Sequence, residues 1–234
     1  MRNVSLFAFA LSLFFFASFD LSGQTKAERK VVAKTSDIGM YNSSKSPEAL
    51  KYYSEGEDFQ KAEEWKKAIA SYKKALKADP NFVEVYDNCG ASYRRLGDLE
   101  NAIKCYKKSI ELYPQGPMAH MNLGLVYAIQ KKFDDAIAEY EALQKISPDD
   151  PEGYYGTINI YIQKKDYKSA IKNAAKTLEI YEAIKSPYLS DGQYLLGLSY
   201  YYDGDTKNAK IYLEQAKKSG VKVPDKICQE LSIK

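Results

Sequence analysis

The chain repeats a pattern every 34 residues, and this period restricts its fold more than any other feature of the sequence. Gly56, Gly90 and Gly124 are 34 residues apart. Three further columns keep the same spacing: the aromatic residues Phe59, Tyr93, Tyr127 and Tyr161, the alanines Ala68, Ala102, Ala136 and Ala170, and the prolines Pro80, Pro114 and Pro148. After an insertion of five residues, the register resumes at Gly197. Such a period is typical of stacked supersecondary units.

Within each period, the repeated columns have helical spacing. Gly90 and Tyr93 lie three residues apart on one stripe, and Ala102 and Tyr106 lie four residues apart on a second stripe. Gly97 interrupts the pattern between the two stripes, as expected for a turn. Each period therefore predicts two helices joined by a short turn.

The beginnings of several helices are also marked. Ser46 precedes a proline, Asn81 is followed three residues later by a glutamate, and Asp150 precedes another proline. Each of these side chains offers an oxygen that can cap a helix, and proline is favoured at the first helical position. We therefore expect helices to begin directly after these three residues.

The order of a small residue, an aromatic residue, alanine, a second aromatic residue, a small residue and proline resembles the tetratricopeptide repeat. The resemblance covers about residues 49–223. It implies an all-α fold, a right-handed superhelical solenoid of five helix–turn–helix units. We expect these units at residues 49–82, 83–116, 117–150, 151–189 and 190–223, followed by a capping helix at 224–234. Unit four departs from the pattern with Ile158 and Ala174, and unit five departs with Leu213.

The N-terminal residues resemble a secretory signal. Arg2 precedes an almost unbroken apolar run from Val4 to Ala17, which is shorter than the roughly 20 residues of a transmembrane helix. We expect a signal peptide at 1–23, cleavage before Gln24 and a polar arm at 24–48. The expected location is therefore outside the cytoplasm, most simply the periplasm, and secretion or membrane association through an uncleaved signal stays open.

The composition argues against several classes of function. The 34 Lys and Arg nearly balance the 31 Asp and Glu, a net charge of +3, whereas nucleic-acid-binding domains usually carry a strong basic excess. The single histidine, His120, occupies an aromatic column and is expected to pack in the core. Cys89 and Cys105 are expected to be small core residues, with a disulfide between them as an alternative. We therefore expect no enzyme activity, no cofactor and no metal.

One motif resembles a calcium-binding loop. Asp203, Asp205 and Glu214 hold the first, third and last positions of that template. Asn208 stands where the template requires glycine, and the turn inside unit five already accounts for the sequence. We therefore do not expect calcium there.

The resemblance implies that the first helix of each unit lines a concave groove that binds a protein or peptide partner. The groove is expected to be charged in its first half, with Arg94 and Arg95 attracting an acidic segment, and apolar in its second half. The expected contact residues are Arg94, Arg95, Met121, Leu125, Tyr155, Asn159, Tyr194, Leu198 and Tyr201. The alternative is a structural subunit of an envelope or secretion assembly that uses its convex face or its ends. Neither hypothesis includes a nucleic acid or stable membrane insertion after signal cleavage.

Overall fold

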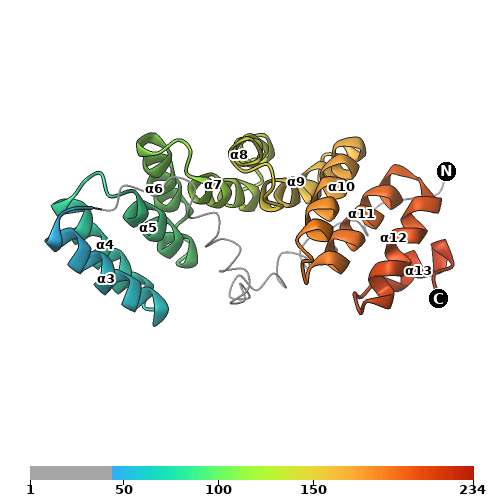
Figure 1. Ribbon diagram of the computed structural model, residues 1–234, viewed down its shortest axis with the longest axis horizontal. Coiled ribbons are helices and arrows are strands. Elements are labelled where there is room, and N and C mark those ends of the chain that lie inside the picture. The colour runs from blue at the N-terminus through green and yellow to red at the C-terminus, as the bar shows by residue number, and fades with distance from the viewer. Residues whose placement is uncertain (1–43) are drawn as a thin grey trace, which may run out of the picture. The chain divides into compact units, whose positions relative to one another are not determined.

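The computed structural model describes residues 44–234, so the expected signal peptide and most of the expected polar arm lie outside the described residues (Figure 1). All regular structure in this range is helical. Its eleven helices are α3 (Pro47–Lys61), α4 (Trp65–Ala78), α5 (Val83–Arg95), α6 (Leu99–Leu112), α7 (Pro117–Ile129), α8 (Phe133–Ile146), α9 (Glu152–Gln163), α10 (Tyr167–Ala183), α11 (Leu189–Asp203), α12 (Thr206–Lys218) and α13 (Asp225–Leu231). No helix in this part of the chain combines the length and the apolar character that crossing a membrane requires.

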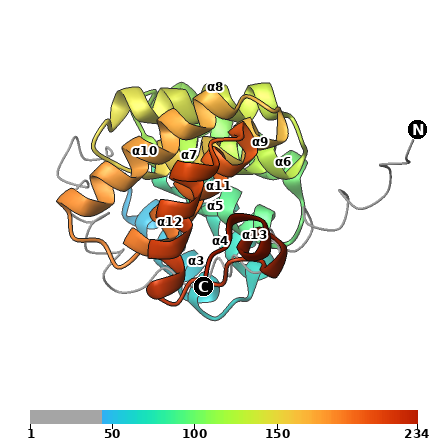
Figure 2. The same ribbon diagram turned by 90° about the vertical axis from the view of Figure 1, so that its right-hand side faces the viewer.

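The helices form five successive pairs, and each pair packs on the next. We call α3, α5, α7, α9 and α11 the first helices, and their partners α4, α6, α8, α10 and α12 the second helices. The backbone of each first helix lies close to that of the next first helix, whereas within residues 44–234 no two second helices come as close. The first helices therefore converge and share one surface, which we call the inner face. The second helices α8 and α10 are joined by a side-chain hydrogen bond, in which Gln144 donates to Asn173 at 3.2 Å. This part of the chain is an all-α solenoid, and α13 lies beside α12 at its C-terminal end (Figure 2).

A glycine on the first helix and a large ring on the second helix set the close approach within a unit. The ring of Tyr72 packs on Gly56 so closely that an added Cβ would lie 2.4 Å from Cε1. The same pairing recurs as Gly90 with Tyr106 and as Gly124 with Tyr140. In unit four the large side chain, Ile158, is on the first helix α9, and the small one, Ala174, is on the second helix α10. Both are fully buried in the same cluster. The apparent departure of unit four from the repeat is therefore a reversal of the same small–large pair.

The predicted start of α3 is correct, whereas α5 begins one residue later than predicted. Ser46 caps α3, and its hydroxyl accepts a hydrogen bond from the amide of Ala49 at 3.2 Å. Helix α3 thus begins inside the last residues expected for the polar arm. Asn81 does not cap α5, because that helix begins after Phe82. The backbone N–H of Asn81 instead donates to the Asp79 carboxylate in the preceding turn.

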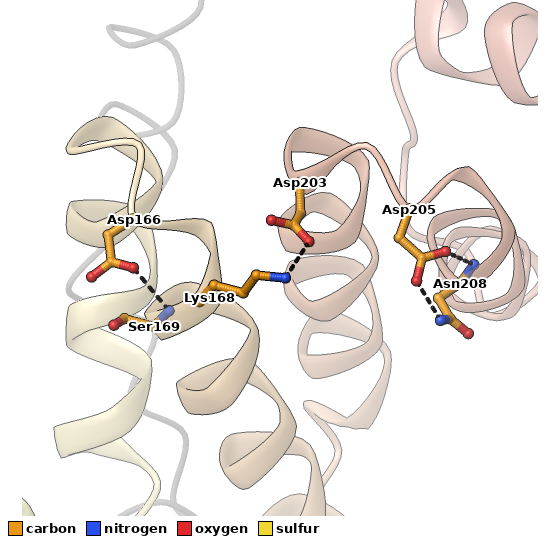
Figure 3. A network of polar contacts seen from close by, with 6 residues as sticks. All are labelled: Asp166, Lys168, Ser169, Asp203, Asp205 and Asn208. Atoms are coloured by element: carbon orange, nitrogen blue, oxygen red, sulfur yellow. Dashed lines mark hydrogen bonds and ion pairs between the residues drawn. The ribbon is translucent and has the colours of Figure 1, made fainter.

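Acidic residues cap three of the second helices, and one acidic residue connects neighbouring units. Asp98, Asp166 and Asp205 cap α6, α10 and α12 by accepting a hydrogen bond from the amide three residues later. Lys168 on α10 forms a 3.3 Å ion pair with Asp203 at the end of α11, which links units four and five (Figure 3). Asp203 and Asp205, the first members of the calcium-like motif, therefore have structural partners.

Candidate interaction surface on the inner face

Four of the expected contact residues lie together on the central first helices. Met121 and Leu125 belong to α7, and Tyr155 and Asn159 belong to α9, a helix that contacts α7. All four side chains are half-buried. The middle of the array thus keeps a surface of mixed apolar and polar character that a partner can reach.

The expected contact residues of unit five are covered by the chain itself. Tyr194 and Leu198 are only 5% and 8% exposed, and they pack with Ile227 and its neighbours in the C-terminal segment. The hydroxyl of Tyr201 donates a hydrogen bond to Glu230 of the same segment. The expectation that Tyr194 and Leu198 line an open groove is therefore wrong, because α13 and the residues around it occupy that part of the surface.

The two arginines diverge from each other. Arg94 lies beside Tyr106. Burial raises the pKa of this tyrosine, and the guanidinium of Arg94 partly offsets the rise. Arg95 is exposed, and its guanidinium lies 5.7 Å from the centre of the Trp65 ring at the start of α4. Arg95 therefore faces a second helix of unit one, and Arg94 and Arg95 do not form one basic patch.

An aromatic ring and two carboxylates meet between units one and two. The hydroxyl of Tyr53 hydrogen bonds to Glu57, and the side-chain amide of Asn88 donates to the same hydroxyl at 3.2 Å. Burial raises the pKa of Tyr53, and the negative charges of Glu57 and Glu84 raise it further. Burial also raises the pKa of Glu84, whose Oε2 is buried without a hydrogen-bond partner. We call these residues the N-terminal acidic site.

A second ring with two carboxylates lies between units four and five. Burial raises the pKa of Tyr155 to about 12, with additional contributions from the charges of Glu152 and Asp191. The same two carboxylates act on the buried phenol of Tyr181. Burial raises the pKa of Asp191 itself. We call Tyr155, Glu152 and Asp191 the C-terminal acidic site.

His120 joins units two and three. Its Nδ1 lies 2.7 Å from Oε2 of Glu139 on α8, and its Nε2 lies 3.1 Å from the carbonyl oxygen of Pro114. A carboxylate and a carbonyl can only accept, so both ring nitrogens carry protons in this arrangement. Burial lowers the pKa of His120, but the hydrogen bonds to Glu139 and Pro114 outweigh it, and the pKa is raised overall.

Within residues 44–234, no group of three or more His, Cys, Asp or Glu side chains is arranged to hold a metal ion. Cys89 and Cys105 are free thiols, the first buried and the second partly buried.

Comparison with known families identifies the repeat. Family models described as "Tetratricopeptide repeat" match residues 90–151 and 191–219, and one described as "TPR repeat" matches residues 49–97. The chain is a tetratricopeptide-repeat protein. Proteins of this family are non-enzymatic scaffolds for protein–protein interaction, and this chain is an interaction module of that kind. No curated protein sequence gives a significant match.

Solved structures of tetratricopeptide-repeat proteins share the fold. A crystal structure of MamA is 25% identical, with a TM-score of 0.66, and the match covers 75% of this chain and 98% of that chain. MamA from Desulfovibrio magneticus RS-1 is 20% identical, with a TM-score of 0.67 and coverage of 75% and 97%. YrrB, described as a TPR protein with an unusual peptide-binding site, is 18% identical, with a TM-score of 0.63 and coverage of 80% and 91%.

Sequence reasoning missed part of the inner face of this repeat protein. Glu84, Glu152 and Asp191 lie in the first turn of α5, α9 and α11. Glu152 and Asp191 stand three residues before Tyr155 and Tyr194, which the family resemblance did indicate, so each lies on the same side of its helix as that tyrosine. An acidic residue in the first turn of four first helices, α3 with Glu48 included, was the signal that could have revealed them.

Proposed function

We propose that this tetratricopeptide-repeat protein binds an extended segment of a partner protein along the inner face of units one to four. The observation that supports this proposal comes from unit five. Tyr194 and Leu198 there correspond in the repeat to Met121 and Leu125 of unit three, and the C-terminal segment buries them. Side chains at these two repeat positions thus pack against a polypeptide segment in unit five, and the equivalent positions of unit three remain half-buried.

The physical basis is the covering of apolar surface that is already held in place. Met121 and Leu125 lie on a helix packed between neighbours on both sides. Covering apolar surface contributes about 25 cal/mol per Å², and a rigid surface loses little conformational freedom on binding. A partner segment that covers these side chains therefore gains affinity without reorganising the array.

A paired substitution tests this function. Met121→Glu with Leu125→Glu places charge in the middle of the inner face and should abolish binding of peptides selected from a random displayed library. Ile184→Glu with Ile211→Glu is the matched control, because these side chains are 45% and 43% exposed and lie away from the first helices. Both variants are first checked for helical content. Equal binding by the two folded variants would move the partner site off the inner face.

We further propose that the protein acts outside the cytoplasm, most simply in the periplasm. This proposal rests on the signal-like pattern of residues 1–23, which lie outside the described residues. Intact-mass measurement of the exported protein should give a chain that begins at Gln24. An exported pool that still begins at Met1 would contradict cleavage.

A further inference from the structure

We propose that the inner face selects a basic segment, with Lys or Arg side chains at its two ends and apolar residues between them. This inference rests on the proposed function and adds the chemistry of the partner. The N-terminal and C-terminal acidic sites would each receive one cationic side chain, and helix α7, through Met121 and Leu125, would contact the apolar middle.

The two acidic sites share two equivalent positions within the repeat. Tyr155 follows Tyr53 by 102 residues, which is three periods, and both lie on first helices. Asp191 follows Glu84 by 107 residues, which is three periods plus the five-residue insertion. Each site therefore combines a tyrosine of one unit with a carboxylate from the first turn of the next unit. The second carboxylate differs between the sites, because Glu57 follows Tyr53 by four residues and Glu152 precedes Tyr155 by three.

Three carboxylates of these sites lack a compensating cation. Within residues 44–234, no ion pair involves Glu57, Glu84 or Asp191. Oε2 of Glu84 is buried without a hydrogen bond, and Asp191 is half-buried. A desolvated carboxylate without a counter-charge is costly, so a bound ammonium or guanidinium group would remove that cost.

The tyrosine rings add a second reason to favour a cation. The faces of aromatic rings attract ammonium and guanidinium groups, most strongly where water is excluded. Tyr53 and Tyr155 are half-buried beside the carboxylates, so one cationic side chain can contact both kinds of group. This combination distinguishes the two sites from an ordinary acidic patch on a solvated helix.

The distribution of charge disfavours an acidic partner. Five carboxylates stand at inner-face positions of the first helices: Glu57, Glu84, Asp87, Glu152 and Asp191. Arg94 is the one arginine there, since Arg95 faces Trp65. Helix α7 has no Asp, Glu, Lys or Arg, and its His120 is buried against Glu139 of α8, whereas α4, a second helix, has five lysines and no acid. An acidic segment would meet like charge at both ends, which reverses the expectation drawn from Arg94 and Arg95.

Fluorescence anisotropy with three probe peptides tests the inference. The peptides share one apolar centre and carry lysine, glutamine or glutamate at both ends. We expect the lysine peptide to bind at least about tenfold more tightly than the glutamine peptide, a difference that shrinks at high salt. The glutamate peptide should bind most weakly. Tighter binding of the glutamate peptide would overturn the inference.

Isosteric variants locate the effect. Glu84→Gln with Asp191→Asn should remove the preference for the lysine peptide. Glu100→Gln with Glu182→Gln removes the same charge from exposed positions on second helices and should preserve that preference. Equal loss in both variants would mean that only the net charge matters, and would overturn the inference.

The failures of the two proposals are distinguishable. If all three peptides bind equally and Met121→Glu with Leu125→Glu abolishes that binding, the inner face binds peptides without charge selection. The function then stands and the inference fails. If the wild-type protein binds none of the peptides and yields none from the displayed library, both proposals fail.

Discussion

The ring of Tyr140 is held between two glycines at different distances, and this difference predicts an order of stability. An added Cβ at Gly156 on α9 would lie 2.4 Å from Cε1 of Tyr140, whereas one at Gly124 on α7 would lie 3.2 Å from the same atom. Carbon atoms that are not bonded do not approach to 2.4 Å, so Gly156→Ala must displace the ring or the helix. Gly124→Ala requires a shift of only a few tenths of an ångström.

Two opposing effects give the expected magnitude. Replacing glycine by alanine inside a helix stabilises it by about 1 kcal/mol. Overpacking a buried site costs about 1–3 kcal/mol, and Tyr140 is only 5% exposed, so the ring has little room to move. Gly156→Ala should therefore lower the free energy of unfolding by about 1–2 kcal/mol, with the overpacking cost near the upper end of its range. Gly124→Ala should leave it within about 0.5 kcal/mol of the wild type.

Urea unfolding followed by circular dichroism measures both values, provided that the slope of the transition stays constant between variants. Tyr140→Leu supplies the control, because it removes the ring that the new methyl group would strike. In that background, Gly156→Ala should lose most of its cost, which appears as a coupling energy in a double-mutant cycle. A Gly156→Ala protein that is more stable than the wild type, or whose cost is unchanged in the Tyr140→Leu background, would refute the reasoning.

Three further predictions follow from contacts described above. Because the pKa of His120 is raised in the folded state, this side chain should stabilise the fold at pH values below 6.5 and lose that contribution as the pH rises through the raised value. NMR titration of this single histidine should show a lower pKa after Glu139→Gln. An unchanged titration curve would contradict the pairing. Asp98→Ala removes the cap of α6 and should lower the urea midpoint of unfolding, and an unchanged midpoint would argue against the cap. Deleting residues 223–234 should uncover Tyr194, lower the thermal midpoint and increase binding of a hydrophobic dye; an unaltered midpoint would show that the C-terminal segment does not stabilise unit five.

The repeat spacing was sufficient to predict the helix pairs, because each pair is defined by residues close in sequence. It was not sufficient to interpret unit four. Ile158 and Ala174, taken one column at a time, are two departures from the pattern. In the structure both side chains belong to one buried cluster, where their combined volume matters more than the identity of either residue. A comparison by pairs of columns, rather than by single columns, would have detected the exchange.

The candidate site was harder to predict, because it depends on contacts between units. Tyr194 and Leu198 are buried by a segment whose packing no local pattern specifies. Arg94 and Arg95 are adjacent in sequence, but consecutive residues of a helix point about 100° apart, so the two guanidinium groups reach different surfaces. Glu84 gained its significance only when the neighbouring unit placed Tyr53 beside it.

The contacts among the first helices also determine how the array responds to force. The backbones of consecutive first helices lie close together, whereas those of consecutive second helices in residues 44–234 do not. Among the second helices, α8 and α10 are joined by the hydrogen bond from Gln144 to Asn173. Bending that opens the inner face pulls the closely packed first helices apart, while the second helices, whose backbones lie further from one another, offer less resistance. The array should therefore resist bending more strongly along its first helices than along its second helices. A segment attached to two neighbouring first helices stiffens that side of the array, and its departure allows the curvature to relax.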